Sequence, residues 1–191
     1  MEIIETLIAD LKLVRSREYE DSRGTFSRSY CMRDFEIITG SRTLKQINLS
    51  VTHKIGAIRG LHLQLPPHSE LKLVRCLKGT VWDVAVDLRQ GSSTFLQWHA
   101  EELSEKNKRV LVIPEGFAHG FQVMASGSQL LYMHTNFYAP DFETGFRYDD
   151  PLLDISWPLT PSDISERDQS HSLLDQNFKG INIILHRNKM I

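Results

Sequence analysis

The stretch Val81-Trp82-Asp83-Val84-Ala85-Val86-Asp87-Leu88 alternates with a period of two residues. Successive side chains of a β-strand point to opposite faces, so this stretch is typical of a strand with a distinct set of residues on each face. Similar short stretches recur between glycines and prolines, at residues 11–15, 25–30, 44–51, 57–63, 70–77, 95–100, 109–113, 120–124 and 129–135. Many short strands at this spacing predict an all-β sandwich, jelly roll or barrel.

Two turns indicate how these strands are connected. Residues 77–80 predict a tight hairpin, in which Gly79 takes the positive φ that the turn requires. Residues 113–120 predict a second turn, which ends at a histidine, His119, that begins the next strand. Two such turn–strand units facing each other would line the mouth of a jelly-roll barrel.

Helices are expected to be few and short. Residues 32–37 and 104–107 are candidates, with Ser104 as a possible N-cap of the second. After Trp157-Pro158 the chain turns polar, which predicts loop and one or two short helices that close over the body. A chain of 191 residues suggests one domain, so we expect residues 1–191 to form it, with roughly 159–191 as a peripheral C-terminal segment.

The composition is that of an ordinary globular protein. Hydrophobic residues make up 41% of the chain and charged residues 24%, and the net charge is -2. No basic excess is present to hold a nucleic acid or an anionic membrane, so neither is expected as a partner. The start of the chain is acidic and no apolar run approaches 18 residues, which predicts a cytoplasmic protein. Cys31 and Cys76 fit a reducing compartment, although one disulfide between them stays possible.

Two constellations of polar residues carry the chemistry. The first comprises Arg59-Gly60-Leu61-His62-Leu63-Gln64 with Glu70, Lys72 and Gly79, and the second is Pro114-x-Gly116-x-x-His119. Together they resemble the two motifs of the cupin superfamily, whose fold is a small double-stranded β-helix. Metal-binding cupins carry a histidine where this chain has Gln64, and an amide is a poor ligand for a borderline metal, so no metal site is expected. His62 alone could be a core histidine, but its neighbours Arg59 and Lys72 favour an anionic ligand.

Further motifs extend the resemblance over residues 10 to 178, nearly the whole chain. They are Asp21-Ser22-Arg23-Gly24, Gln46-x-Asn48-x-Ser50, Lys72-Leu73-Val74-Arg75, Leu131-Tyr132, Tyr138-Ala139-Pro140, Asp149-Asp150-Pro151 and Ile155-x-Trp157-Pro158. In this order they closely resemble the dTDP-4-dehydrorhamnose 3,5-epimerase family. The resemblance implies a cupin-type jelly roll with a few short peripheral helices. It also implies an epimerase that works by acid–base chemistry without a metal or cofactor, in deoxysugar biosynthesis.

The substrate implied is a nucleotide-linked 4-keto-6-deoxy sugar, with dTDP as the expected nucleotide, inverted at C3 and C5. Both carbons flank the C4 ketone, so the reaction needs a base on one face, an acid on the other and a donor for the enolate oxygen. By resemblance, His62 is the base and Asp168 pairs with it and fixes its tautomer. Tyr132 is the proton donor on the opposite face, and Lys72 stabilises the enolate oxygen.

Further residues are implied to hold the nucleotide sugar. Arg59 and His119 resemble the residues beside the pyrophosphate, and a guanidinium has the planar donor fork that suits phosphate. Tyr19 resembles an aromatic that stacks on the base, and Arg23 a residue that reaches the nucleotide from the partner subunit of a homodimer. Gln46 and Asn48 resemble polar contacts to the nucleoside and sugar, and Tyr138 a second tyrosine near the sugar.

Some positions depart from the family's pattern. Ser27-Arg28 stands where an acid is usual, and Met133-His134-Thr135 and the tail 176–191 are atypical. The base of the nucleotide, and whether C3, C5 or both are inverted, therefore stay open. Besides the epimerase, the alternatives are a nucleotide-sugar-binding cupin without turnover, an epimerase of a single carbon, and a metal-dependent cupin, which Gln64 disfavours.

Overall fold

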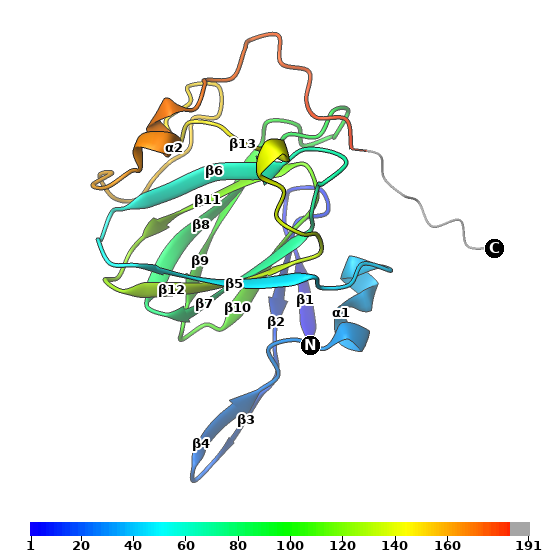
Figure 1. Ribbon diagram of the computed structural model, residues 1–191. Coiled ribbons are helices and arrows are strands. Elements are labelled where there is room, and N and C mark those ends of the chain that lie inside the picture. Colours follow the sequence, from blue (N-terminus) through cyan, green and yellow to red (C-terminus); the bar gives the residue numbers. More distant parts are fainter. Residues whose placement is uncertain (184–191) are drawn as a thin grey trace, which may run out of the picture.

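The computed structural model describes residues 1–183, and two β-sheets face each other in it (Figure 1). The six-stranded sheet has the order β1-β2-β10-β7-β12-β5. Its strands are β1 (Glu2–Glu5), β2 (Lys12–Arg15), β5 (Gln46–Thr52), β7 (Lys72–Lys78), β10 (Arg109–Ile113) and β12 (Ser128–His134). The five-stranded sheet has the order β13-β6-β11-β8-β9. Its strands are β6 (Ile58–Gln64), β8 (Thr80–Asp87), β9 (Trp98–Ser104), β11 (Phe117–Val123) and β13 (Glu143–Gly145).

The chain passes repeatedly from one sheet to the other, since β6, β8, β11 and β13 lie in one sheet and β7, β10 and β12 in the other. Within each of these two sheets, every pair of neighbouring strands is antiparallel. This winding is that of a double-stranded β-helix, so the prediction of an all-β, cupin-type jelly roll is confirmed.

The β7–β8 connection corrects one predicted hairpin. Residues 77–80 were expected to join two paired strands, but β7 and β8 belong to different sheets. Gly79 has φ +78°, and a Cβ there would lie 2.4 Å from Ser128 Oγ. A glycine is therefore required, as predicted, but at a corner between the sheets. Such a corner uses the same residue type as a hairpin, so the local sequence could not separate the two.

The predicted turn at 113–120 is a corner of the same kind, between β10 and β11. The following strand begins at Phe117, so His119 lies inside β11 and does not begin it. The helix predicted at 104–107 is also wrong. Ser104 ends β9, and a loop closes where its backbone N–H donates to Asn107 Oδ1 and the Asn107 N–H donates to Ser104 Oγ. The capping hydrogen bond expected of Ser104 thus forms without a helix.

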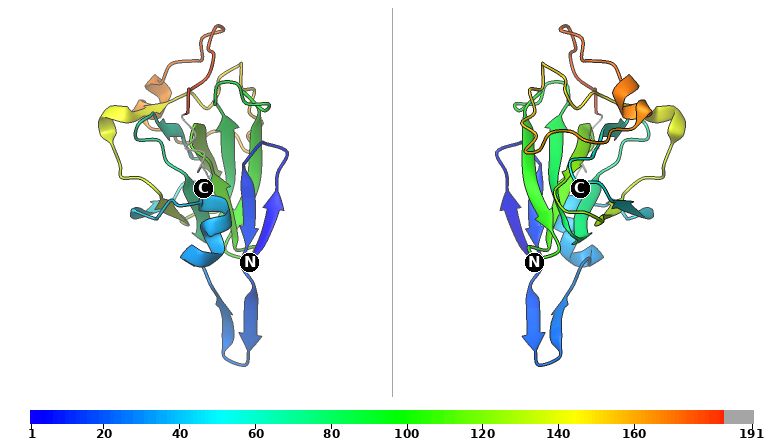
Figure 2. Two further views of the ribbon diagram at one scale, coloured as in Figure 1. Left: turned by 90° about the vertical axis from the view of Figure 1, so that its right-hand side faces the viewer. Right: turned by 90° about the vertical axis from the view of Figure 1, so that its left-hand side faces the viewer.

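The cores explain the pattern of β8. Val81 and Ala85 point between the sheets, into a core with Leu111, Phe117 and Leu130. The opposite face of β8 is also buried, because the segment after β13 covers the five-stranded sheet. The residues of this second core include Val84, Val86, Leu88, Leu153, Leu174 and Ile181. The predicted C-terminal segment therefore packs over the body, with the short helix α2 (Glu166–Ser170) within it (Figure 2).

Helix α1 (Met32–Thr39) is two residues longer than predicted, and Phe35 packs it against the outer face of the six-stranded sheet. Before it, β3 (Glu18–Asp21) and β4 (Gly24–Ser27) form a hairpin that projects from the body (Figure 1). The sequence predicted one strand over 25–30 and neither β3 nor β1. Within residues 1–183, no helix is both long and apolar enough to cross a membrane.

Candidate active site

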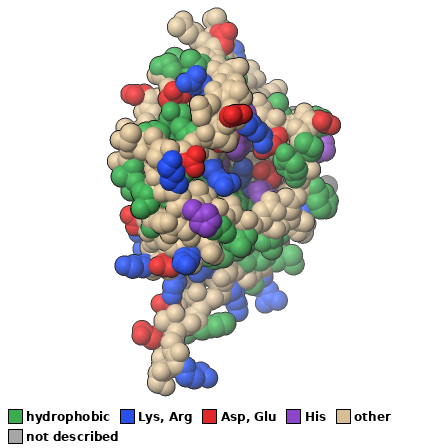
Figure 3. All heavy atoms as spheres, turned by 60° about the vertical axis from the view of Figure 1, so that its left-hand side comes forward, with side chains coloured by type: hydrophobic (Ala, Val, Ile, Leu, Met, Phe, Trp, Pro, Cys, Tyr) green, Lys and Arg blue, Asp and Glu red, His purple; other side chains and the backbone are tan. Residues whose placement is uncertain are grey.

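A pocket of about 290 Å³ opens between the two sheets. Eight of the eleven predicted site residues line it: Gln46, Asn48, Arg59, His62, Lys72, His119, Tyr132 and Tyr138. They come from β5, β6, β7, β11 and β12 and from the loop after β12, so the sheet pairing brings together residues far apart in sequence. On the face of the molecule shown in Figure 3, histidine and charged side chains gather in a hollow above the projecting hairpin.

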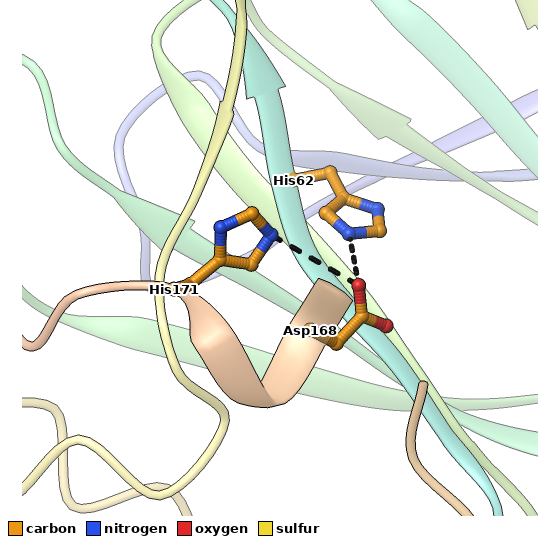
Figure 4. A group of neighbouring side chains, drawn as sticks. All are labelled: His62, Asp168 and His171. Atoms are coloured by element: carbon orange, nitrogen blue, oxygen red, sulfur yellow. Dashed lines mark hydrogen bonds and ion pairs between the residues drawn. The ribbon is translucent and has the colours of Figure 1, made fainter. Parts of the chain in front are cut away.

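His62 and Asp168 form the hydrogen bond that the resemblance implied. His62 Nε2 donates to Asp168 Oδ1 over 2.7 Å (Figure 4). The second carboxylate oxygen of Asp168 accepts the backbone N–H of Gly60 at 3.1 Å, and the Asp168 N–H donates to the N-cap Ser165. Burial alone would raise the pKa of Asp168, but the hydrogen bond and charge of His62 and the Gly60 N–H hold it below its usual value. The carboxylate therefore stays ionised and can fix the imidazole tautomer.

Gly60 makes this arrangement possible because two strands approach closely there. Its φ is +118°, and a Cβ would lie 2.6 Å from Gly120 Cα in the neighbouring strand β11. No other residue type fits this contact. The backbone of β6 is thereby held where its N–H reaches Asp168.

His171 belongs to the same group and was missed from the sequence. Its Nε2 lies 3.9 Å from Asp168 Oδ1, and its ring packs edge-on to the ring of His62 with the centroids 5.7 Å apart. Burial and the neighbouring His62 lower the pKa of His171, so its imidazole is neutral at pH 7. The spacing of three residues from Asp168 was the only available signal, and it is a common one.

His119 lies directly opposite His62 across the β11–β6 pairing. Its Nε2 donates to Asp83 Oδ1 over 2.9 Å, and Asp83 is fully buried. The period-two alternation of β8 predicts that Asp83 shares a face with Val81 and Ala85, and this face points between the sheets. Arg59 is exposed at the pocket, and its side chain makes no hydrogen bond or ion pair within the part of the chain that the structure describes. A guanidinium in this state is available to an anionic ligand.

Lys72 is held in the pocket wall by a carboxylate. Its Nζ lies 3.3 Å from Glu70 Oε1, and both side chains are about 8% exposed. His134 Nδ1 donates to the other oxygen of Glu70 at 2.8 Å. Burial would raise the pKa of Glu70, but the hydrogen bond from His134 and the charge of Lys72 lower it. Glu70 therefore stabilises the buried cation, and His134, which stood out as atypical, is part of the same cluster.

Tyr132 lies on β12, in the sheet opposite His62. Burial raises the pKa of Tyr132 well above its usual value, so the phenol keeps its proton. Its ring is edge-on to that of His119, with the centroids 6.1 Å apart. Tyr138 is half exposed, and its hydroxyl donates to Glu143 Oε2 over 2.8 Å.

Gln64, the residue that departs from metal-binding cupins, holds a loop. Its Nε2 donates to the carbonyl oxygens of His68 and Phe137, and its Oε1 accepts the N–H of Ala139 at 2.6 Å. The Tyr138 N–H next to it donates to Gln46 Oε1. Both amides therefore position the loop that carries Tyr138.

Tyr19 and Arg23 lie outside this pocket. Both are on the β3–β4 hairpin, where Tyr19 is 56% exposed and Arg23 pairs with Asp21 at 2.6 Å. The structure therefore brings together Asp168 and the eight residues of the pocket, but not these two.

Comparisons with known proteins agree in one family. The model of the dTDP-4-dehydrorhamnose 3,5-epimerases matches residues 5–176. The dTDP-4-dehydrorhamnose 3,5-epimerase of Salmonella typhimurium is 42% identical over 178 residues, which are 92% of this chain and 97% of the relative. That of Pseudomonas aeruginosa is 44% identical over 171 residues, 88% of this chain and 93% of the relative.

A solved structure extends the agreement to three dimensions. The dTDP-6-deoxy-D-glucose-3,5-epimerase of Legionella pneumophila, crystallised with dTDP-4-keto-L-rhamnose, superposes with a TM-score of 0.88. It is 38% identical to this chain, and the match covers 95% of this chain and 98% of that one.

Proposed function

Because the chain belongs to the dTDP-4-dehydrorhamnose 3,5-epimerase family, we propose that it converts dTDP-4-dehydro-6-deoxyglucose to dTDP-4-dehydrorhamnose by inverting C3 and C5. The observation that carries this proposal is the hydrogen bond between Asp168 and His62, which is on one sheet, with Tyr132 on the sheet across the pocket. Inversion needs proton removal on one face of the sugar and delivery on the other. A base and an acid on opposite walls meet that need.

His62 is the proposed base. Because its Nε2 donates to Asp168, its other ring nitrogen carries the lone pair that takes the proton from C3 or C5. The electron pair of the broken C–H bond moves to the C4 oxygen and forms an enolate. Lys72, held by Glu70, is the proposed cation for that oxygen, and Tyr132 then delivers a proton to the opposite face.

No net redox change occurs in this reaction, so the chemistry requires no nicotinamide. Proton transfer and charge stabilisation by side chains supply each step that an epimerisation beside a ketone needs. Chelator dialysis tests this part of the proposal. Loss of turnover that returns with one divalent metal would overturn it.

The nucleotide is proposed to extend from the pocket towards a second subunit. The pocket volume is near the lower limit for small-molecule sites, which suits the sugar better than a whole nucleotide sugar. Arg59 and His119 are the proposed pyrophosphate contacts, and Gln46 and Asn48 the contacts to sugar and nucleoside. A homodimer in which Arg23 and Tyr19 of one chain reach the nucleotide of the other would explain why both project from the body.

The apolar surface of β5 supports this homodimer. Ile47, Leu49 and Val51 alternate along β5 and are 60%, 57% and 39% exposed. The strand is at the edge of its sheet, where unpaired backbone groups and apolar side chains are available to another chain. A cytoplasmic location also stays a proposal, based on the sequence.

Solvent deuterium exchange tests the function most simply. The protein is incubated in heavy water with dTDP-4-keto-6-deoxyglucose, and proton NMR follows the signals at C3 and C5. Exchange at both carbons with formation of the epimer is expected. Binding without exchange would indicate a nucleotide-sugar-binding cupin, and exchange at one carbon a single-carbon epimerase.

A further inference from the structure

His62, Asp168 and His171 offer three metal-ligating atoms from two parts of the chain. Among residues 1–183 these atoms, one from each side chain, lie within 4.8 Å of one another. His62 is on β6, Asp168 is in α2, and His171 directly follows that helix. Figure 4 shows both imidazoles directed towards Oδ1 of Asp168. Of these three residues, only His62 and Asp168 take part in the proposed acid–base chemistry. That chemistry does not explain His171.

From this geometry we propose an inhibitory site for a divalent zinc ion. Two imidazole nitrogens and one carboxylate oxygen are a ligand set that zinc prefers, with a fourth position left for water. Zinc–nitrogen bonds of about 2.0–2.1 Å place tetrahedral ligand atoms about 3.4 Å apart. The separations here are 2.7 Å between His62 Nε2 and Asp168 Oδ1 and 3.9 Å between His171 Nε2 and the same oxygen. These separations lie on either side of that value, so modest side-chain shifts would fit the ion.

His171 has an unused ligand atom. Its Nε2 is buried and makes no hydrogen bond with any residue of the described chain. A buried nitrogen without a partner costs free energy, which a metal bond would recover. A Cβ at position 145 would lie 2.4 Å from this nitrogen, so Gly145 leaves the space that the imidazole occupies.

The surroundings of Asp168 also suit a metal ligand. Its second oxygen accepts the Gly60 N–H, and its backbone N–H donates to Ser165. Hydrogen bonds of this kind orient a ligating carboxylate. Oδ1, whose hydrogen-bond partner here is His62 Nε2, would bind the ion once that nitrogen gives up its proton. The side chain of His62 is 29% exposed, which gives an ion access from the pocket.

Zinc at this position would stop the proposed reaction. This inhibition rests on the proposed function, whereas the binding of zinc does not. A metal on Nε2 of His62 uses the lone pair of that nitrogen, so the single proton of the neutral imidazole must move to the other nitrogen. The nitrogen that should accept a proton from the sugar then carries one already. The ion would bind behind the base and need not displace the substrate, so it should lower kcat rather than raise KM.

Binding is measured first, without substrate, by titrating the metal-free protein with zinc chloride in a calorimeter. One zinc ion per chain is expected, and cobalt should give the visible absorption of a four-coordinate site. His171→Ala and His171→Gln should both bind zinc at least about 10-fold more weakly, since even outer-shell changes cost that much. His53→Ala is the matched control, because His53 is exposed and outside the cluster, and it should bind like the parent.

Inhibition is then compared with each protein's own metal-free rate. Parent and His53→Ala should lose turnover over the concentration range in which they bind zinc, and the His171 variants should resist it. Equal binding by the parent and both His171 variants, or no binding by the parent, would overturn the site. Because the calorimetric result needs no turnover, failure of the epimerase proposal would leave that result intact.

Discussion

The side chains of His62 and Asp168 meet over 2.7 Å although 106 positions separate them in the sequence. The strand β6 fixes His62, and Ser165 caps the short helix that carries Asp168. Asp168 is only 3% exposed, so the carboxylate is held by the Gly60 N–H, Ser165 and His62 rather than by water.

Asp168→Asn should reduce turnover by about 10² to 10⁴, the usual contribution of general-base catalysis. The amide keeps the size of the side chain but can reverse the preferred tautomer of His62, so the lone pair would face the wrong way. Steady-state kinetics with dTDP-4-keto-6-deoxyglucose measure the effect. Asp163→Asn is the control, because Asp163 is exposed and should leave the rate near that of the parent. Normal turnover by Asp168→Asn would remove Asp168 from the mechanism.

Tyr132→Phe should still remove a proton from the sugar but should fail to complete inversion. The raised pKa of Tyr132 keeps its phenol protonated at neutral and moderately alkaline pH, which is the form that donates. Deuterium from heavy water should therefore enter the substrate with its original stereochemistry, together with a large loss of epimer. Should this variant invert as fast as the parent, Tyr132 is a packing residue and Tyr138 is the better donor.

Glu70→Gln should weaken both the proposed enolate site and the fold. The buried Lys72 would lose its carboxylate partner, and removing one partner of a buried ion pair costs about 3–5 kcal/mol. We expect a lower midpoint of urea unfolding and a lower kcat with a smaller change in KM. His134→Gln separates the two roles, because it leaves the Lys72–Glu70 pair and should retain more turnover. An unchanged kcat in Glu70→Gln would show that Lys72 is not positioned by Glu70.

The free energy of unfolding should decrease at acid pH because Asp87 becomes protonated. Burial would raise its pKa, but hydrogen bonds from Arg89, Ser92 and Thr94 lower it below the usual 3.8. A lowered pKa means that the folded state binds its proton later than the unfolded state as the pH falls. The contribution is therefore complete above about pH 4–5 and is lost as the pH falls through the lowered pKa.

Asp87→Asn should lose about 3–5 kcal/mol of unfolding free energy at pH 7, because the buried Arg89 loses its buried carboxylate partner and keeps only the exposed Asp10. The variant should also show a flatter fall in stability on acidification, measured by urea unfolding between about pH 3 and 7. Asp149→Asn, at the half-exposed Arg147–Asp149 pair, is the control. It should change the unfolding free energy at pH 7 and the pH dependence of that free energy much less. Equal stability of parent and Asp87→Asn would contradict the role of this network.

Much of the fold was predictable because period-two alternation and glycine positions are local properties. The strands at 57–63, 70–77 and 109–113 agree with β6, β7 and β10 to within two residues. Which strands pair with each other was not predictable, since Gly79 suits a hairpin and a corner between sheets equally well. The strand β3 was missed because both strands of the projecting hairpin are almost wholly exposed, so their residues do not alternate between a buried and an exposed face.

The candidate site depended on the family resemblance more than on spacing. Asp168 lies in a polar segment where an aspartate is normally solvated, and no local signal pairs it with His62. His134 and His171 were not selected because neither belongs to the motifs that carried the resemblance. Their contacts with Glu70 and Asp168 arise only when distant segments pack together.

Exchange of the substrate protons in heavy water by His62→Asn tests the central claim most directly. Asparagine resembles histidine in shape but cannot accept and hold a proton, and the fold can be checked by circular dichroism. We expect the parent to exchange both C3 and C5 and the variant to exchange each about 10² to 10⁴ times more slowly. Near-normal exchange at both carbons by folded His62→Asn would contradict the account, because the base would then lie elsewhere.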